Sequence, residues 1–80
     1  ISAKVFPNPV ADGFFNLNLP ADTEFPVVVQ IFSMSGQKIM QKDLNDYTNT
    51  IETFNLKNGM YIVAIYLNGE VQKVKLQVME

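Results

Sequence analysis

The chain of 80 residues contains no cysteine, no histidine, no tryptophan and no arginine. Without cysteine, no disulfide can close its loops and no thiolate can bind a metal. Without histidine, it lacks the side chain that most often serves as a general base near neutral pH and most often ligates metals. The composition therefore indicates no activity, and we expect no catalytic residue, no metal site and no cofactor.

Strong charge patterning and long apolar runs are also missing. Six lysines and eight acidic residues give a net charge of −2, without a block of like charges. A nucleic-acid interface needs a basic stripe, so nucleic acid is not expected as a partner. The longest apolar run, residues 60–67, is well short of the roughly 20 residues that a membrane-spanning helix requires. We therefore expect no insertion into a membrane.

The length corresponds to one small domain, residues 1–80. The first residue is Ile1 rather than methionine. We therefore expect the chain to be a domain excised from a larger protein.

What the sequence does contain is a β pattern throughout. Apolar residues recur at every second position, turn residues interrupt them at short intervals, and no segment keeps a helical period over three turns. Such regular spacing of short strands is typical of an antiparallel sandwich or barrel. The predicted strands are residues 13–19, 26–34, 37–44, 50–56, 60–67 and 70–79, with a short further strand over Lys4 to Phe6.

The last predicted hairpin can be checked for internal consistency. Asn68-Gly69 is the strongest two-residue hairpin turn, since both residues tolerate positive φ, and it pairs Leu67 with Glu70. One face of the ribbon then becomes apolar and the other amphipathic, as a half-buried antiparallel pair requires. The pairs on the largely apolar face are Tyr61 with Leu76, Val63 with Val74 and Ile65 with Gln72, and the outer pairs are Ile62 with Lys75 and Ala64 with Lys73.

The stretch "SMSGQ" (33–37) predicts another hairpin, with two possible turns. A two-residue Ser35-Gly36 turn would require positive φ at a serine. A type I turn with Gly36 as the left-handed residue places glycine where glycine is needed. We prefer the second turn, which pairs Ile31 with Ile39.

The stretch "FPNPVADG" (6–13) carries two prolines that lack N–H groups. It therefore cannot lie in the middle of a sheet, and we expect a sheet edge or a crossing from one strand to another. The plain structural interpretation is a rigid start to the domain with Phe6 packed as an anchor.

In "LKNGMYIV" (56–63), Asn58-Gly59 predicts a turn that begins a strand, and Tyr61 is expected to bury its ring as a structural corner tyrosine.

Lys73 and Lys75 point the same way from the last predicted strand. Two exposed lysines most often belong to a solvated face or protect a sheet edge from aggregation. The alternative is a recognition patch, and the residues alone leave both open.

Other chemistry-bearing residues form no recognisable motif. Asp43 and Asp46 share a loop, but no calcium-loop spacing surrounds them. The serines have no histidine partner, so a serine triad is excluded; Ser-Lys chemistry stays open, but no motif supports it. The scattered aromatic residues Tyr47, Phe54 and Tyr66 could form a sugar-binding platform, although strand aromatics more often belong to a core.

Three stretches taken together resemble one family. "VFPNP", "VVVQIFSMSGQKI" and "LKNGMYIVAIYLNGEVQKVKL" are similar, in this order and spacing, to the type A C-terminal sorting domain of the type IX (Por) secretion system of Bacteroidota. The likeness runs from about residue 4 to residue 78. The family's motif positions fall on Pro7, Asn8, Pro9, Gly36, Gly59, Tyr61, Lys73 and Lys75.

The resemblance implies that the domain is a sorting signal and not an enzyme. Such a domain is carried at the C-terminus of a secreted cargo protein and folds in the periplasm as an immunoglobulin-like antiparallel β-sandwich. The outer-membrane translocon recognises it and exports the cargo, and a sortase-like cysteine peptidase usually removes it. The cargo is then released or attached to the cell surface. The two alternatives are an accessory carbohydrate-binding sandwich and a spacer domain of a secreted enzyme.

Overall fold

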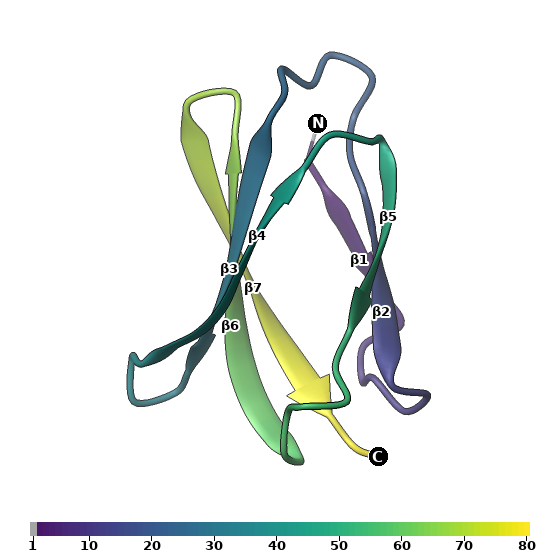
Figure 1. Ribbon diagram of the computed structural model, residues 1–80, viewed down its shortest axis with the longest axis vertical. Coiled ribbons are helices and arrows are strands. Elements are labelled where there is room, and N and C mark those ends of the chain that lie inside the picture. The colour runs from purple at the N-terminus through teal and green to yellow at the C-terminus, as the bar shows by residue number, and fades with distance from the viewer. Residues whose placement is uncertain (1) are drawn as a thin grey trace.

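The computed structural model describes residues 2–80, and within that range every regular element is a β-strand. This confirms the predicted all-β class and the number of strands (Figure 1). The strands are β1 (Lys4–Phe6), β2 (Phe14–Asn18), β3 (Val27–Ser33), β4 (Lys38–Leu44), β5 (Thr48–Glu52), β6 (Gly59–Leu67) and β7 (Glu70–Val78).

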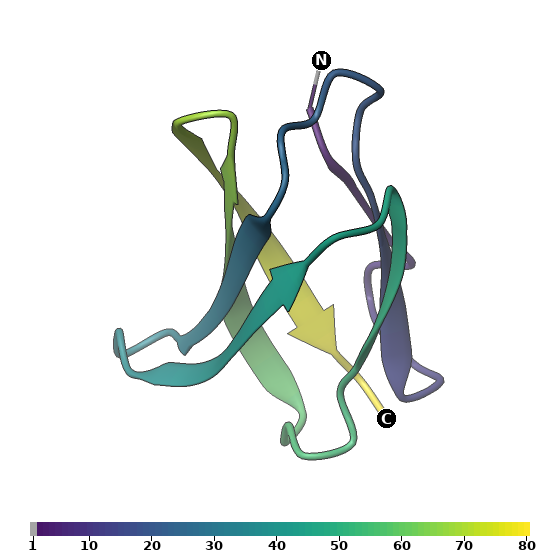
Figure 2. The same ribbon diagram turned by 45° about the horizontal axis from the view of Figure 1, so that its top comes forward.

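The strands form two antiparallel sheets that pack face to face (Figures 1 and 2). One sheet has three strands in the order β1-β2-β5, and the other has four in the order β4-β3-β6-β7. In immunoglobulin-like sandwiches, the third, sixth and seventh strands of the chain share one sheet, as β3, β6 and β7 do here. The predicted immunoglobulin-like sandwich is therefore confirmed.

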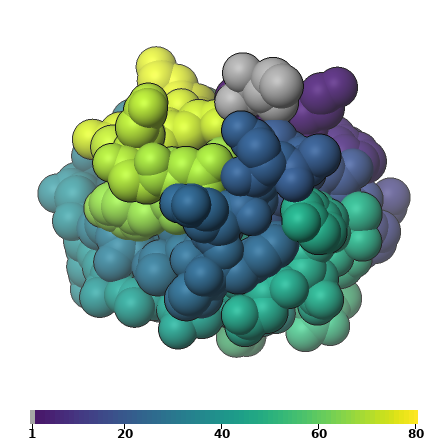
Figure 3. Space-filling view, turned by 90° about the horizontal axis from the view of Figure 1, so that it is seen from above, coloured from purple at the N-terminus to yellow at the C-terminus, as the bar shows by residue number. Residues whose placement is uncertain are grey.

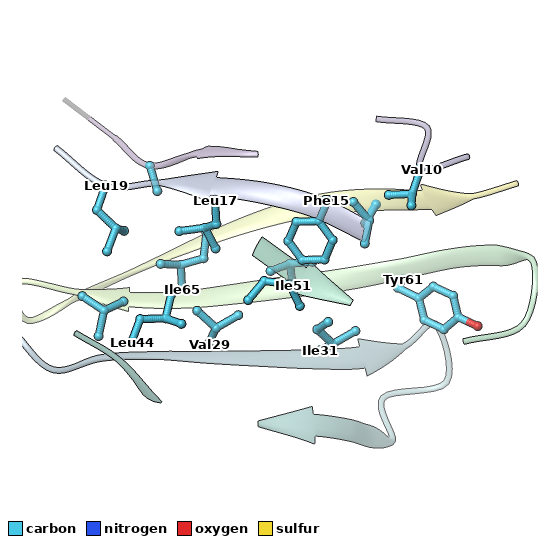
Figure 4. Packing of buried hydrophobic residues seen from close by; sticks show 14 of the residues in the cluster. Val10, Phe15, Leu17, Leu19, Val29, Ile31, Leu44, Ile51, Tyr61 and Ile65 are labelled. Atoms are coloured by element: carbon cyan, nitrogen blue, oxygen red, sulfur yellow. The ribbon is translucent and has the colours of Figure 1, made fainter. Parts of the chain in front are cut away.

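A single apolar core fills the space between the sheets (Figure 4). Alternate residues of each strand point inward, as the pleat of a strand requires. Phe15 and Leu17 from the three-stranded sheet meet Val29, Ile31 and Ile65 from the other, and all five are at most 1% exposed. Fully burying one such side chain contributes about 1.5–3 kcal/mol. In a chain without disulfides, this core is the main source of stability.

The β6–β7 hairpin has the predicted register at every pair. Leu67 lies opposite Glu70, and the remaining pairs follow back to Gly59 opposite Val78. Asn68 and Gly69 have φ of 51° and 79°, which is the left-handed conformation that this turn demands. The turn therefore sets the register of 18 residues from its local chemistry alone.

The turn between β3 and β4 is of the predicted type, but the pairing behind it is not. Gly36 has φ of 92°, and its N–H donates to the Ser33 carbonyl at 2.9 Å. The register then shifts, so that Ile31 pairs with Met40 rather than with Ile39. The predicted Ile31–Ile39 pair was wrong because an extra residue bulges from β4, leaving Ile39 43% exposed.

The predicted strand over residues 50–56 is shorter and begins earlier. It ends at Glu52, and a turn follows in which the Leu56 N–H donates to the Thr53 carbonyl at 2.9 Å. The turn returns Leu56 to the core, where it is 6% exposed. The prediction was misled because Phe54 and Leu56 are apolar, although they do not share the parity of Ile51 in β5.

Candidate recognition face and the segment that braces it

The N-terminal segment, residues 2–10, crosses from one sheet to the other. β1 pairs with β2, whereas Val10 forms a parallel bridge with Val78 at the end of β7. The Val10 N–H donates to the Gln77 carbonyl at 2.7 Å, and the Met79 N–H donates to the Val10 carbonyl at 2.8 Å. Pro7 and Pro9 lie at the crossing, where their missing N–H groups interrupt no strand ladder. The predicted strand-to-strand crossing is confirmed, and it runs between the two sheets.

The anchor of this segment is not the residue that we expected. Phe6 is 44% exposed, whereas Val10 is fully buried. The expectation that Phe6 packs as an anchor was therefore wrong. Its side chain lies on a three-residue edge strand, and only one side of that strand faces the core.

Asn8 fastens the crossing to β7 with its side chain. Its Nδ2 donates to the Lys75 carbonyl at 2.7 Å, and its Oδ1 accepts from the Gln77 N–H at 3.0 Å. The amide thus makes the two bonds that a neighbouring strand would make, at a point where the flanking prolines cannot donate. Part of the outer edge of β7 is covered in this way.

A second amide holds the same two segments farther along β7. The Gln72 Nε2 donates to the Ala3 carbonyl, and its Oε1 accepts from the Ala3 N–H, both at 2.9 Å. Here the side chain belongs to β7 and the backbone to the N-terminal segment, the reverse of the Asn8 contact. Together, the two amides hold the first described residues of the domain against its last strand.

Tyr61 and Gly59 have structural positions at the start of β6. The Tyr61 ring is 8% exposed, and its hydroxyl donates to the Lys57 carbonyl at 2.5 Å. A tyrosine near the start of the sixth strand that bonds back to the preceding loop is a known feature of immunoglobulin-like folds. The predicted corner tyrosine is confirmed.

Lys73 and Lys75 project from the outer face, which is the solvent-facing side of the four-stranded sheet (left in Figure 1). They pair with Ala64 and Ile62 of β6, which alternate along the strand with core residues and therefore point away from the core. Val63, Ile65 and the other residues of opposite parity fill the interior. The predicted division into an apolar inner side and an outer side with lysines is therefore confirmed.

A shallow hollow of about 290 Å³ lies on the outer face beside Lys73. Ala64 is 1% exposed on the central strand β6, and its small side chain leaves room between larger neighbours. The lining residues are Phe32, Ser33, Met34, Gly36, Ile62, Ala64, Tyr66 and Lys73. Two of the motif positions, Gly36 and Lys73, thus lie at the same depression although 37 positions separate them.

The sequence reasoning missed this hollow, although the signal was present. Residues 60–67 are apolar at nearly every position, so β6 presents apolar side chains on both of its faces. On a strand with one solvated face, alternation with polar residues is the norm. The uninterrupted run therefore marked an outer face unlike an ordinary solvated one.

The remaining candidates do not gather into a site. Tyr66 lies on β6, whereas Tyr47 precedes β5 in the other sheet and Phe54 follows it, so the suggested sugar platform does not form. Among residues 2–80, no three His, Cys, Asp or Glu side chains come together as a metal site. Within the same range, no helix has the length and apolar character needed to cross a membrane.

The β6–β7 turn, at the end of the hairpin away from Gly59 and Tyr61, contacts residues 22–24. Asn68 accepts from the Glu24 N–H at 2.7 Å and donates to the Asp22 carbonyl at 3.1 Å. Figure 3 views this end, where the yellow-green turn lies beside the blue segment that follows β2. The turn is therefore fixed from outside as well as by its own conformation.

Fold and surface together define a class: an immunoglobulin-like sandwich whose last strand displays lysines. Comparison with known protein families assigns the chain to one of them. Residues 4–79 match the family described as the secretion system C-terminal sorting domain. The chain belongs to this family, and it is a C-terminal secretion signal of the type IX system. A sorting signal of this kind is not itself catalytic, and its cargo is destined for secretion or the cell surface.

A curated relative shows the same domain within a larger protein. The chain is 33% identical over 77 residues to ulvan lyase NLR42 of Nonlabens ulvanivorans. The match covers 94% of this chain and 14% of that protein. The chain thus spans about one seventh of the length of this relative.

Proposed function

We propose that the outer-membrane translocon of the type IX system recognises this domain through the outer face of its four-stranded sheet, with Lys73 and Lys75 as the charged contacts. The observation that carries the proposal is their placement. Both lysines are exposed on one side of an edge strand, and Asn8 binds the backbone of Lys75 itself. The other motif positions, Pro7, Pro9, Gly36, Gly59 and Tyr61, support recognition by fixing the fold that presents this strand.

In this proposal, residues 1–80 are one C-terminal domain of a larger secreted protein, as the small share of the relative's length suggests. The domain folds in the periplasm and delivers the cargo that precedes it to the translocon. A sortase-like cysteine peptidase then cuts upstream of the folded part. Binding is weak and reversible, because cargo must be released, and a lysine-bearing strand face suits such binding better than a large apolar interface.

The test uses the chain as the C-terminal domain of a secreted reporter in a bacterium with a type IX system. The unchanged fusion is expected on the cell surface or in the medium. The double substitution Lys73→Glu and Lys75→Glu is expected to retain the reporter in the periplasm. Exposed substitutions of this kind change stability by about 0.5 kcal/mol or less, so the urea midpoint should not move.

The matched control makes the same charge change elsewhere, with Lys4→Glu and Lys57→Glu. Both lysines are exposed and lie off the outer face. Export of the control with retention of the Lys73/Lys75 variant supports the proposal. Retention of the unchanged fusion would refute the sorting role, and equal export of both variants would remove only the lysines from it.

A further inference from the structure

The outer face differs in charge from the rest of the molecule. The registers of the four-stranded sheet place Lys38, Lys73 and Lys75 on this face, together with one carboxylate, that of Asp43. Three of the six lysines and one of the eight acidic residues give it a net charge of +2. The remainder of the chain carries −4. A cationic face on an acidic protein attracts anionic partners and orients their approach.

Between its lysines, the face is largely apolar, although the polar Gln30 lies opposite Ala64 on β3. Phe32 and Ile62 are half-buried neighbours across β3 and β6, and Tyr66 is 44% exposed. Lys38 lies on the β4 side of this strip, and Lys73 and Lys75 lie on the β7 side. Exposed apolar patches with a charged rim mark binding sites, and aromatic residues and methionines are enriched in the central part of protein interfaces.

The hollow gives this strip a shape into which a side chain can bind. Its volume of about 290 Å³, the small Ala64 and the surrounding Phe32 and Tyr66 form a recess beside Lys73. Interfaces commonly gain most of their affinity from a few apolar anchors that enter such recesses, while charges at the rim set orientation and association rate.

We propose that the hollow over Ala64 is the anchor point of the recognition face, and that its occupant is an acidic protein segment. This inference rests on the function proposed above and names the chemistry of the partner. One aliphatic or aromatic side chain of the segment enters the recess between Phe32, Ile62 and Tyr66. Carboxylates on either side of it pair with Lys73 and Lys75 on β7 and with Lys38 on β4.

If the hollow is the anchor point, removing apolar contact there lowers affinity for the partner even when no charge changes. Tyr66→Ser removes a wall of the hollow without changing any charge, and it is expected to lower affinity for the partner about tenfold. In the reporter fusion, export should fall accordingly while the urea midpoint stays close to that of the unchanged chain. Phe6→Ser is the matched control, because Phe6 is also 44% exposed but lies on β1 of the other sheet.

The occupant is identified by a photo-cross-linking residue placed at position 66, with position 6 as the control. The adduct is digested and the joined peptide sequenced. An acidic peptide with an apolar residue, joined only from position 66 and lost in the Lys73→Glu and Lys75→Glu variant, supports the proposal. Adducts to a second copy of the chain, to glycan or lipid, or to a peptide without carboxylates overturn it.

The two proposals fail in different ways. If the unchanged fusion is exported and the lysine variant is retained, but Tyr66→Ser is exported normally, the hollow is not the anchor and the sorting role stands. If the unchanged fusion is itself retained, the sorting role fails, and this inference fails with it.

Discussion

The N-terminal segment (residues 2–10) and the β6–β7 hairpin lie against each other, but different interactions determine their positions. The hairpin contains its own turn, its own ladder and alternating side chains that choose its buried face. The N-terminal segment has a three-residue strand, two prolines and one parallel bridge. Its place depends on the buried Val10 and on two side-chain amides, that of Asn8, which binds β7, and that of Gln72, which reaches from β7 to Ala3.

The difference shows how the edge of the lysine-bearing strand β7 is covered. β7 is an edge strand, and an edge strand with unpaired N–H and C=O groups is open to pairing with other chains. The Asn8 amide covers such groups at Lys75 and Gln77. The local hairpin therefore builds the recognition strand, and the distant segment protects its edge.

The largest expected effect comes from breaking the hairpin's packing. Leu76→Ala removes a fully buried side chain from β7 and is expected to lower the free energy of unfolding by about 2–5 kcal/mol. Urea denaturation followed by circular dichroism measures the loss. Lys75→Ala, one residue earlier and exposed, should change it by no more than about 0.5 kcal/mol. Equal losses would contradict the assigned inner and outer sides.

A smaller effect is expected from breaking the brace. Asn8→Ala removes two hydrogen bonds to β7, each of which contributes about 0.5–1.5 kcal/mol, so a loss of about 1–3 kcal/mol is expected. Hydrogen exchange should accelerate at the Gln77 amide and remain slow at Val63 in the middle of β6. Asn45→Ala, in an exposed loop, is the control. Unchanged exchange at Gln77 would show that the segment does not hold the edge.

The smallest effect is expected at the hairpin turn. Gly69 has φ of 79° and open space where a Cβ would lie, so Gly69→Ala meets backbone strain but no clash, at a cost of about 1 kcal/mol. Gly69→Asn is the matched control, since asparagine tolerates the left-handed region and should cost less. The comparison is read from thermal unfolding midpoints. A larger loss for asparagine than for alanine would contradict a conformational origin.

Strand positions and the hairpin faces could be predicted because they depend on neighbours in sequence. Apolar runs and turn residues located the seven strands, although β5 was placed too late in the chain, and Asn68-Gly69 set the pairing of β6 with β7. The bulge at Ile39 could not be predicted in this way, because the choice between Ile39 and Met40 depends on which side chain the core accommodates. The exposure of Phe6 likewise depends on where β1 lies in its sheet.

Of the candidate site, the sequence predicted the lysines and their shared direction but not the hollow beside them. The hollow needs Phe32 of β3 next to Ile62 and Tyr66 of β6, and a sheet order that makes β3 and β6 neighbours. No local pattern specifies which strands become neighbours. Motif positions such as Asn8 could be named from the resemblance, but their physical role could not.

By itself, the sequence determined an all-β chain without histidine or cysteine, a hairpin with a fixed register and a pair of lysines on its outer side, because turn chemistry and period-two alternation act between near neighbours. Tertiary structure alone decided that Asn8 and Gln72 join the two ends of the domain, that β4 carries a bulge, and that an apolar recess opens beside Lys73. These features arise where segments distant in sequence pack together, and packing depends on the shape of the whole core.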